Sequence, residues 1–214
     1  MIIDVWSDVV CPWCFIGKRR LERALATFAH HEQITIRHRA FQLDPNTLDV
    51  VPTDKLLAEK YGADEAGVKS MQANVCAIAE GEALHYNFNG SLSGNTFDAH
   101  RLLLWAATIG KQDLLLEAMY SAYFEKSKPL FSHTDLVAVA LSVGIDADFT
   151  EDVLLSDAFQ DEVVADRKLA AALGANGVPF FVIDLKYGIS GAQSVDVFAQ
   201  TLETAWEEHL SLTS

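Results

Sequence analysis

Hydrophobic residues near the N-terminus first follow a strand pattern and then a helical pattern. Residues 2–6 are rich in Ile and Val, as in a buried central strand. The apolar positions between 12 and about 30 then recur every three or four residues, as on one face of an amphipathic helix. Pro12 suits the first turn of that helix. Residues 34–41 alternate with period two and predict a second strand, which ends at a turn over 44–46.

The middle of the chain, from about 53 to 173, predicts helices only. The expected helices are 54–61, 65–80, 96–109, 112–126, 133–143, 149–155 and 157–173. Residues 85–95 contain two glycines and predict a loop. Thr53, Asp64 and Ser132 are candidate N-caps, because short polar side chains accept hydrogen bonds from the first turn of a helix.

A strand pattern returns near the C-terminus. The glycines of 174–177 break the helical run, and 180–183 and 187–190 predict a hairpin of two short strands. A last amphipathic helix is expected over about 194–210. The order is therefore β-α-β, a helical block, then β-β-α. We predict a small mixed sheet with helices on its faces, interrupted by a helical insertion.

Composition and charge limit the partners. Half of the 214 residues are hydrophobic, which is enough for a sizeable core. The formal charge of −14 repels phosphate backbones and anionic lipid, so we expect no nucleic-acid partner and no membrane partner. No apolar run reaches the roughly 18 residues of a membrane span. No basic and apolar leader precedes the first strand, which predicts a cytoplasmic protein.

The chain has three cysteines, Cys11, Cys14 and Cys76, too few for a disulfide-stapled scaffold. The first two form a Cys-Pro-Trp-Cys motif at the start of the first predicted helix, and this spacing brings two sulfurs within disulfide reach. Free backbone N–H groups and the helix dipole stabilise a thiolate at Cys11. Cys14, nearly one turn further in, can then attack a mixed disulfide formed at Cys11.

Other interpretations of this motif are less favourable. A zinc site needs four ligands, usually in two close pairs, and Cys76 is the only other cysteine, so we predict no metal. An incidental pair fits the strand–Cys-x-x-Cys–helix context poorly. Pro12 stiffens the turn. Trp13 either shields the sulfurs and contacts an apolar substrate or packs in the core, and the sequence favours neither.

The motifs together resemble those of the DsbA family, and most closely its cytoplasmic FrnE-like branch. The resemblance rests on Cys-Pro-Trp-Cys-Phe after the first strand and on Gly-Val-Pro-Phe-Phe followed by Ile-Ser-Gly-Ala-Gln near the C-terminus. It covers nearly the whole chain. It implies an α/β, thioredoxin-like fold with a large all-helical insertion. The thioredoxin-like domain would comprise 1–46 and 174–214, and the insertion 47–173.

The resemblance also implies a function and a second part of the site. The chain is expected to be a dithiol–disulfide oxidoreductase or isomerase with Cys11 and Cys14 as its catalytic pair. A cis peptide bond is implied between Val178 and Pro179, with Pro179 packed beside Cys11. The Val178 backbone would then be free to pair with an extended substrate. From the residues alone, a trans proline that begins an edge strand is the alternative.

Three further residues need an interpretation. Members of the family often carry a buried acid six residues before the first cysteine, where this chain has Val5. Asp8, just before Cys11, is a candidate replacement, and the alternative is a turn-forming aspartate. His100 either faces the active-site cleft or is a hydrogen-bonded buried histidine. Cys76 is expected to be an inert apolar residue, because the insertion holds no second cysteine to pair with it.

The expected partners follow from the same resemblance. No cofactor is expected besides the cysteine pair, with a thiol- or disulfide-bearing protein or small molecule as substrate. Glutathione or a thioredoxin system would serve as reductant, and a homodimer is the default assembly. Two other functions stay open. The fold also resembles kappa-class glutathione transferases and 2-hydroxychromene-2-carboxylate isomerases, although those typically carry Ser where Cys11 stands. A non-catalytic holdase would not depend on the cysteines.

Overall fold

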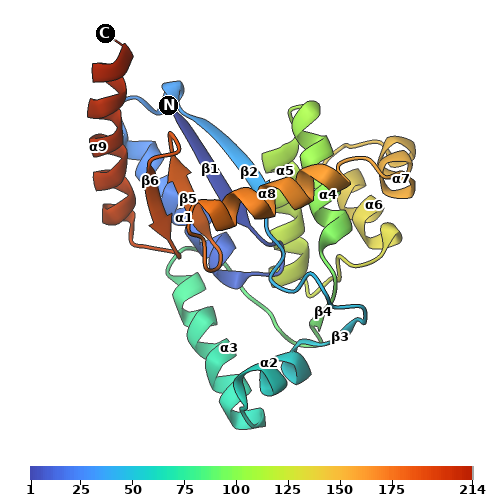
Figure 1. The fold of residues 1–214 in the computed structure, drawn as a ribbon. Coiled ribbons are helices and arrows are strands. Elements are labelled where there is room, and N and C mark those ends of the chain that lie inside the picture. Colours follow the sequence, from blue (N-terminus) through green and yellow to red (C-terminus); the bar gives the residue numbers. More distant parts are fainter. Residues whose placement is uncertain (214) are drawn as a thin grey trace.

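A four-stranded sheet built from both ends of the chain forms the centre of the computed structural model, which describes residues 1–213 (Figure 1). The strand order is β2-β1-β5-β6. β1 (Ile2–Ser7) is parallel to β2 (Thr35–Ala40) and antiparallel to β5 (Phe180–Ile183), and β5 is antiparallel to β6 (Tyr187–Ser190). The sheet therefore joins residues that lie more than half of the sequence apart, as predicted.

Two helices cover one face of this sheet. α1 (Pro12–Thr27) packs against α9 (Val195–Thr213), and both bury apolar side chains against the strands. Side chains alternate between the two faces of a strand, so Ile3 and Val5 of β1 enter this core while Trp6 points to the other face. α1 is shorter than predicted and is followed by a 3-10 turn over His31–Gln33.

The opposite face is covered by α8 (Gln160–Ala172), which crosses the sheet beside β2 (Figure 1). Ala170 of this helix packs with Trp6, and the Trp6 indole donates a hydrogen bond to the Asp166 carbonyl at 2.8 Å. The division into 1–46 with 174–214 and 47–173 stays a prediction. That division assigns α8 to the insertion, although α8 packs against the sheet.

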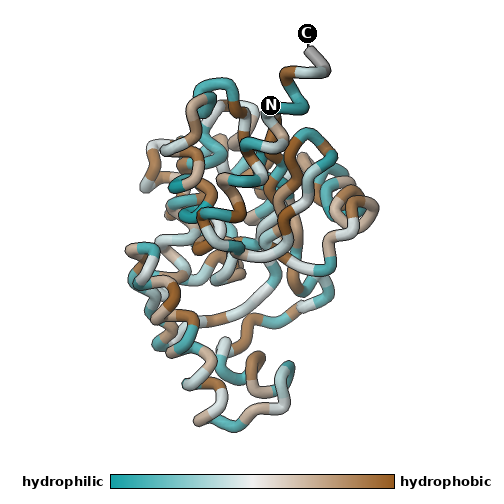
Figure 2. The backbone as a smooth tube through the Cα atoms, turned by 90° about the vertical axis from the view of Figure 1, so that its left-hand side faces the viewer, coloured by the Kyte–Doolittle hydropathy of each residue, from teal (hydrophilic) through white to brown (hydrophobic). Residues whose placement is uncertain are grey.

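The segment between β2 and α8 is largely helical. Its helices are α2 (Thr53–Tyr61), α3 (Glu65–Glu80), α4 (Phe97–Thr108), α5 (Gln112–Tyr120), α6 (His133–Ser142) and α7 (Ala147–Leu155). α5 continues as a π-helical stretch over Ser121–Glu125. The pair α2 and α3 projects away from the body, while hydrophobic positions concentrate along the central strands (Figure 2). Within residues 1–213, no helix combines the length and the apolarity needed to cross a membrane.

A short ladder in the insertion was missed. β3 (Val51–Pro52) pairs with β4 (Leu92–Ser93) in a region where only helices and a loop were predicted. Strands of two residues are too short to show a period. The prediction of Thr53 as an N-cap was wrong. Pro52, at the end of β3, holds the N-cap position of α2, and Thr53 is the first residue of the helix. The Thr53 hydroxyl lies instead 3.0 Å from the Ser93 hydroxyl, across this ladder.

The other two predicted caps are confirmed. The Asp64 side chain accepts a hydrogen bond from the Gly67 N–H at the start of α3. Ser132 forms a capping box with Asp135 at the start of α6. Each cap satisfies backbone donors that the first turn of a helix leaves free. These short-range contacts fix where two helices of the insertion begin.

Candidate redox site

Cys11 is the N-cap residue of α1. The chain leaves β1 at Ser7 and turns so that the Cys11 N–H donates to the Asp8 carbonyl at 3.0 Å. The Cys11 backbone is extended, Pro12 follows at the first helical position, and no side chain caps the helix. The first turn also carries no acidic residue. The positive end of the helix is therefore directed at the thiol of Cys11, where it stabilises a thiolate.

Cys14 lies one turn deeper and differs electrostatically. Only 2% of its surface is exposed, and that of Cys11 is 4% exposed. Burial raises the pKa of the Cys14 thiol well above its usual value, and the adjacent Cys11 raises it further. Both cysteines are free thiols in this structure. Both sulfurs are thus nearly fully buried, and the pair differs in position and in charge: Cys11 lies at the helix end, and Cys14 carries the raised pKa.

The peptide bond between Val178 and Pro179 is cis, and this segment lies against the first turns of α1. The Cys11 thiol is 3.5 Å from the Val178 carbonyl oxygen, to which it can donate. Gly17 makes the close approach possible. A Cβ atom at Gly17 would lie 3.0 Å from Pro179 Cγ and 3.1 Å from Phe181 Cζ. The structure therefore brings together Cys11, Val178 and Pro179, which the sequence places far apart.

The insertion supplies one side of the site. The Tyr86 hydroxyl donates to the Pro12 carbonyl oxygen at 2.7 Å, and its ring stacks against those of Phe15 and Phe124. Trp13 is 38% exposed, which makes it a surface residue beside the cysteines and not a core residue. Sequence reasoning missed Tyr86 because it lies in a loop with no periodic pattern. Its aromatic neighbours belong to α1 and to the π-helical stretch.

A small cavity lies on the inner side of Cys14. Its volume is about 20 Å³, room for one water molecule. The polar side chains of its lining are those of Ser7, Lys18, Glu22, His38, Asp113 and Tyr120. The Asp113 carboxylate is 3.1 Å from the Lys18 ammonium and 3.0 Å from His38 Nε2. This polar cluster joins α1, β2 and α5. No local pattern in the sequence predicts it.

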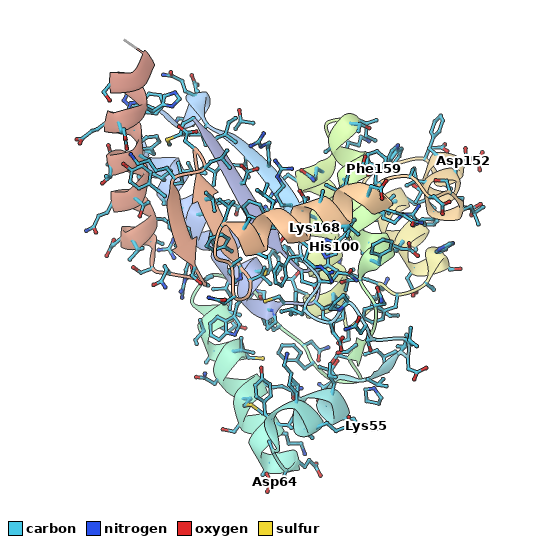
Figure 3. All side chains as sticks on the ribbon, viewed as in Figure 1. Lys55, Asp64, His100, Asp152, Phe159 and Lys168 are labelled. Carbon is cyan, nitrogen blue, oxygen red and sulfur yellow. The ribbon has the colours of Figure 1, made fainter. Side chains whose placement is uncertain are left out.

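The two remaining candidates, Asp8 and His100, lie side by side. One Asp8 oxygen accepts the Leu43 N–H at 2.7 Å, and the other is 3.4 Å from His100 Nε2. Asp8 is 1% exposed and His100 is 2% exposed. Figure 3 shows His100 in the interior, near the crossing of α8 and α4. Asp8 therefore binds a segment distant in sequence, and His100 is buried and does not face an open cleft.

Cys76 lies apart from the redox pair on α3. Its thiol is 3.8 Å from the Tyr86 carbonyl oxygen, and burial raises the pKa of that thiol. A higher pKa means less thiolate, and the thiolate is the reactive form. Among residues 1–213, no group of three or more His, Cys, Asp or Glu side chains is placed to hold a metal ion.

A Cys-x-x-Cys pair at the N-terminus of the first helix, after a central strand and beside a cis proline, defines the class of thioredoxin-like disulfide oxidoreductases. Residues 2–203 match the DSBA-like thioredoxin domain family. The chain therefore belongs to this family. Its fold is α/β and thioredoxin-like with a helical insertion, and it is a disulfide oxidoreductase.

Known proteins agree with this assignment. A probable DsbA oxidoreductase from Streptomyces coelicolor is 43% identical, with a TM-score of 0.93 over 97% of this chain and 91% of that chain. The uncharacterized protein YwbO of Bacillus subtilis is 25% identical over 202 residues, 94% of each chain. The cytosolic disulfide reductase DsbM of Pseudomonas aeruginosa, in a structure with GSH, is 14% identical with a TM-score of 0.66 and full coverage of both chains. At that identity the likeness shows the fold alone.

Proposed function

We propose that this oxidoreductase exchanges disulfides through Cys11 and Cys14. The observation that carries the proposal is the asymmetry of the pair. Cys11 takes the N-cap of a helix that no side chain caps, while Cys14 is buried with a raised pKa. An outer thiolate is the better nucleophile, and an inner thiol that stays protonated does not compete with it.

The proposed reaction has two exchange steps. The Cys11 thiolate attacks one sulfur of a substrate disulfide, the substrate S–S bond breaks, and the leaving sulfur departs as a thiolate that takes up a proton. Cys14 then loses its proton and attacks the Cys11 sulfur of the mixed disulfide, which releases the second substrate sulfur. The substrate gains two electrons and two protons. The protein is left with a Cys11–Cys14 disulfide.

A reductant must return the protein to the dithiol. Two molecules of glutathione would supply the two electrons and two protons and leave as one glutathione disulfide, and a thioredoxin system would supply the same. In a reducing cytoplasm the resting form is the dithiol, which favours reductase or isomerase work. The similar fold of DsbM, a cytosolic disulfide reductase whose structure was solved with GSH, supports this direction. The resemblance of the motifs to the cytoplasmic FrnE-like branch supports it as well.

The proposed substrate is a disulfide-bearing segment that approaches past Trp13 and Val178. Val178 precedes β5 and lies beside the Cys11 thiol, so its backbone is placed to pair with an extended chain. Trp13 offers an exposed apolar ring next to the same sulfur. Pro12 and Pro179 hold the two backbones in place. A small-molecule disulfide would need only the Cys11 contact.

A redox titration of the cysteine pair tests this function. The protein is equilibrated in buffers with different ratios of reduced to oxidised glutathione. Its free thiols are then alkylated, and its mass is measured by mass spectrometry. We expect a reversible two-electron transition confined to Cys11 and Cys14, absent in Cys11→Ser and unchanged in Cys76→Ser. Cys14→Ser should accumulate the mixed disulfide with glutathione, because no resolving thiol is left. If no intramolecular disulfide forms at any ratio, the proposal is wrong, and glutathione conjugation or holdase activity becomes the function to assay.

A further inference from the structure

A buried carboxylate and a buried imidazole meet at the junction between the sheet and the insertion. Asp8 belongs to the turn that leads from β1 to Cys11, and His100 belongs to α4. Asp8 Oδ1 and His100 Nε2 are 3.4 Å apart. Among the described residues neither atom has a hydrogen-bond partner, and both are fully enclosed. Burying a polar or charged atom without a partner costs free energy. An electrostatic interaction between Asp8 Oδ1 and His100 Nε2 would offset that cost for both atoms.

The charges around this pair do not balance unless His100 is protonated. Asp166 of α8 accepts hydrogen bonds from Arg39 and from the Ala40 N–H, and it interacts electrostatically with His100. Arg39 also binds Asp4, which binds Arg37 in turn. The charged members of this network are the buried carboxylates Asp4, Asp8 and Asp166 and the partly exposed guanidinium groups Arg37 and Arg39. With a neutral His100 the network holds one excess negative charge, and with a protonated His100 it is neutral.

Asp8 acts directly on the redox cysteines. Its carbonyl oxygen accepts the Cys11 N–H, which fixes the turn that presents the thiol. The pKa of Cys14 is raised chiefly by burial and by Cys11; the Asp8 charge adds to this, while a hydrogen bond from the Asp8 backbone lowers it. The Asp8 charge also adds to burial in raising the pKa of Tyr120. Tyr123, from the π-helical stretch, faces the same charge. An Asp8 carboxylate without a neutralising partner would therefore oppose a thiolate at the site.

We propose that His100 is a positioning residue: it holds the proton of a buried ion pair with Asp8, and this pair sets the reduction potential of the Cys11–Cys14 couple. The inference rests on the proposed disulfide exchange and adds its regulation from the insertion. Stabilising a thiolate favours the reduced form of the pair and makes it more oxidising. His100 achieves this by cancelling the Asp8 charge and not by contact with the substrate.

Charge variants test the pair because their effects have opposite signs. His100→Gln leaves Asp8 without its counter-charge, so the midpoint in glutathione buffers should move toward a stronger reductant. Asp8→Asn removes a carboxylate charge that acts on Cys14, while its side-chain oxygen can still accept the Leu43 N–H. The midpoint of this variant should move toward a stronger oxidant. We expect changes of about three- to tenfold in the equilibrium constant, or about 15–30 mV for a two-electron couple.

Controls separate this inference from loss of structure and from failure of the proposed function. His133→Gln breaks a comparable but exposed contact with Asp98, at 3.2 Å, and should leave the midpoint unchanged. The double variant of Asp8 and His100 should fall between the two single variants. Shifts of the same sign in both single variants, or no shift in either, would overturn the inference. A wild-type protein that forms no disulfide would instead contradict the proposed function.

A measurement on the wild-type protein keeps the inference testable if His100→Gln does not fold. Nitrogen-15 NMR distinguishes a doubly protonated imidazole from either neutral tautomer. At pH 7 we expect the buried imidazole of His100 to carry protons on both ring nitrogens. A neutral imidazole at that pH would overturn the ion pair.

Discussion

At the residue scale, the site depends on side chains that are small or absent where backbones meet. Gly17 is the clearest case, because α1 carries it nearly one turn beyond Cys14, facing Pro179. A glycine inside a helix normally costs stability relative to alanine. Here it is required, since the cis-proline segment occupies the space of its Cβ atom. The contact holds Val178 against the Cys11 thiol.

Gly17→Ala should therefore destabilise the protein, against the usual direction for a helical glycine. The added methyl would lie 3.0 Å from Pro179 and 3.1 Å from Phe181, both held by the core or the sheet. Overpacking of this kind costs about 1–3 kcal/mol. Urea unfolding measures the free energy, and disulfide reduction should slow as Pro179 is displaced. Gly177→Ala is the control, because no atom outside its two chain neighbours lies within 4 Å of its Cβ position. Equal stability of Gly17→Ala and wild type would contradict the steric role.

At the element scale, α1 is the part that joins the two halves of the molecule. Cys11, Cys14 and Phe15 pack into the core of the insertion, while Leu21 and Phe28 pack with the sheet. A polar contact at the middle of α1 adds to this. Glu82, in the turn after α3, accepts hydrogen bonds from Arg20 at 2.7 Å and Arg23 at 2.6 Å. The Glu82 side chain is only 7% exposed.

Replacing Glu82 by Gln should loosen the arm formed by α2 and α3. Burial alone would raise the pKa of Glu82, but the hydrogen bonds from Arg20 and Arg23 outweigh it and lower the pKa. The carboxylate is thus the form that the fold stabilises, and its loss should cost about 1–3 kcal/mol. Denaturant unfolding and amide exchange in α3 would measure this. Glu65→Gln, which breaks an exposed pair with Lys69, should change neither. A similar loss in both variants would argue against a specific contact.

Periodicity predicted the helices and the four main strands to within a few residues, because each has a buried face that the sequence records locally. The Cys-Pro-Trp-Cys motif is equally local. The contacts that complete the site are not local in the sequence. Tyr86 and Pro12, which share a hydrogen bond, are 74 residues apart in the sequence, and Cys11 and Val178 are 167 residues apart. No spacing rule connects such pairs, so only the resemblance pointed to Val178. Nothing in the sequence paired Asp8 with His100.

At the scale of the whole molecule, charged groups between the sheet and the insertion make stability depend on pH. Lys18 and Arg19 of α1 face Asp113 and Glu117 of α5. The pKa of Asp113 is lowered, chiefly by its hydrogen bond with His38 and the charge of Lys18. Burial would raise the pKa of Glu117, but Arg19 and Lys18 together lower it. Burial raises the pKa of Asp166, which acts in the opposite sense.

The free energy of unfolding should therefore fall in acid. A carboxyl group with a lowered pKa in the folded state stabilises fully above its unfolded pKa of about 4 and loses that contribution as the pH falls below it. Of the four carboxyl groups Glu82, Asp113, Glu117 and Asp166, only Asp166 has a raised pKa, so we expect a net loss of stability below about pH 5.

Urea unfolding over a pH series measures this loss. Asp113→Asn should lower stability at neutral pH and flatten the acid slope, because the residue no longer titrates. Asp152→Asn, on the outer surface of α7 (Figure 3), should leave the slope as it is. An unchanged slope in Asp113→Asn would mean that the acid sensitivity arises elsewhere than at the junction of α1 and α5. The apolar core and the remaining polar contacts of α1, such as those of Glu82, would then hold the insertion to the redox helix without a contribution from Asp113.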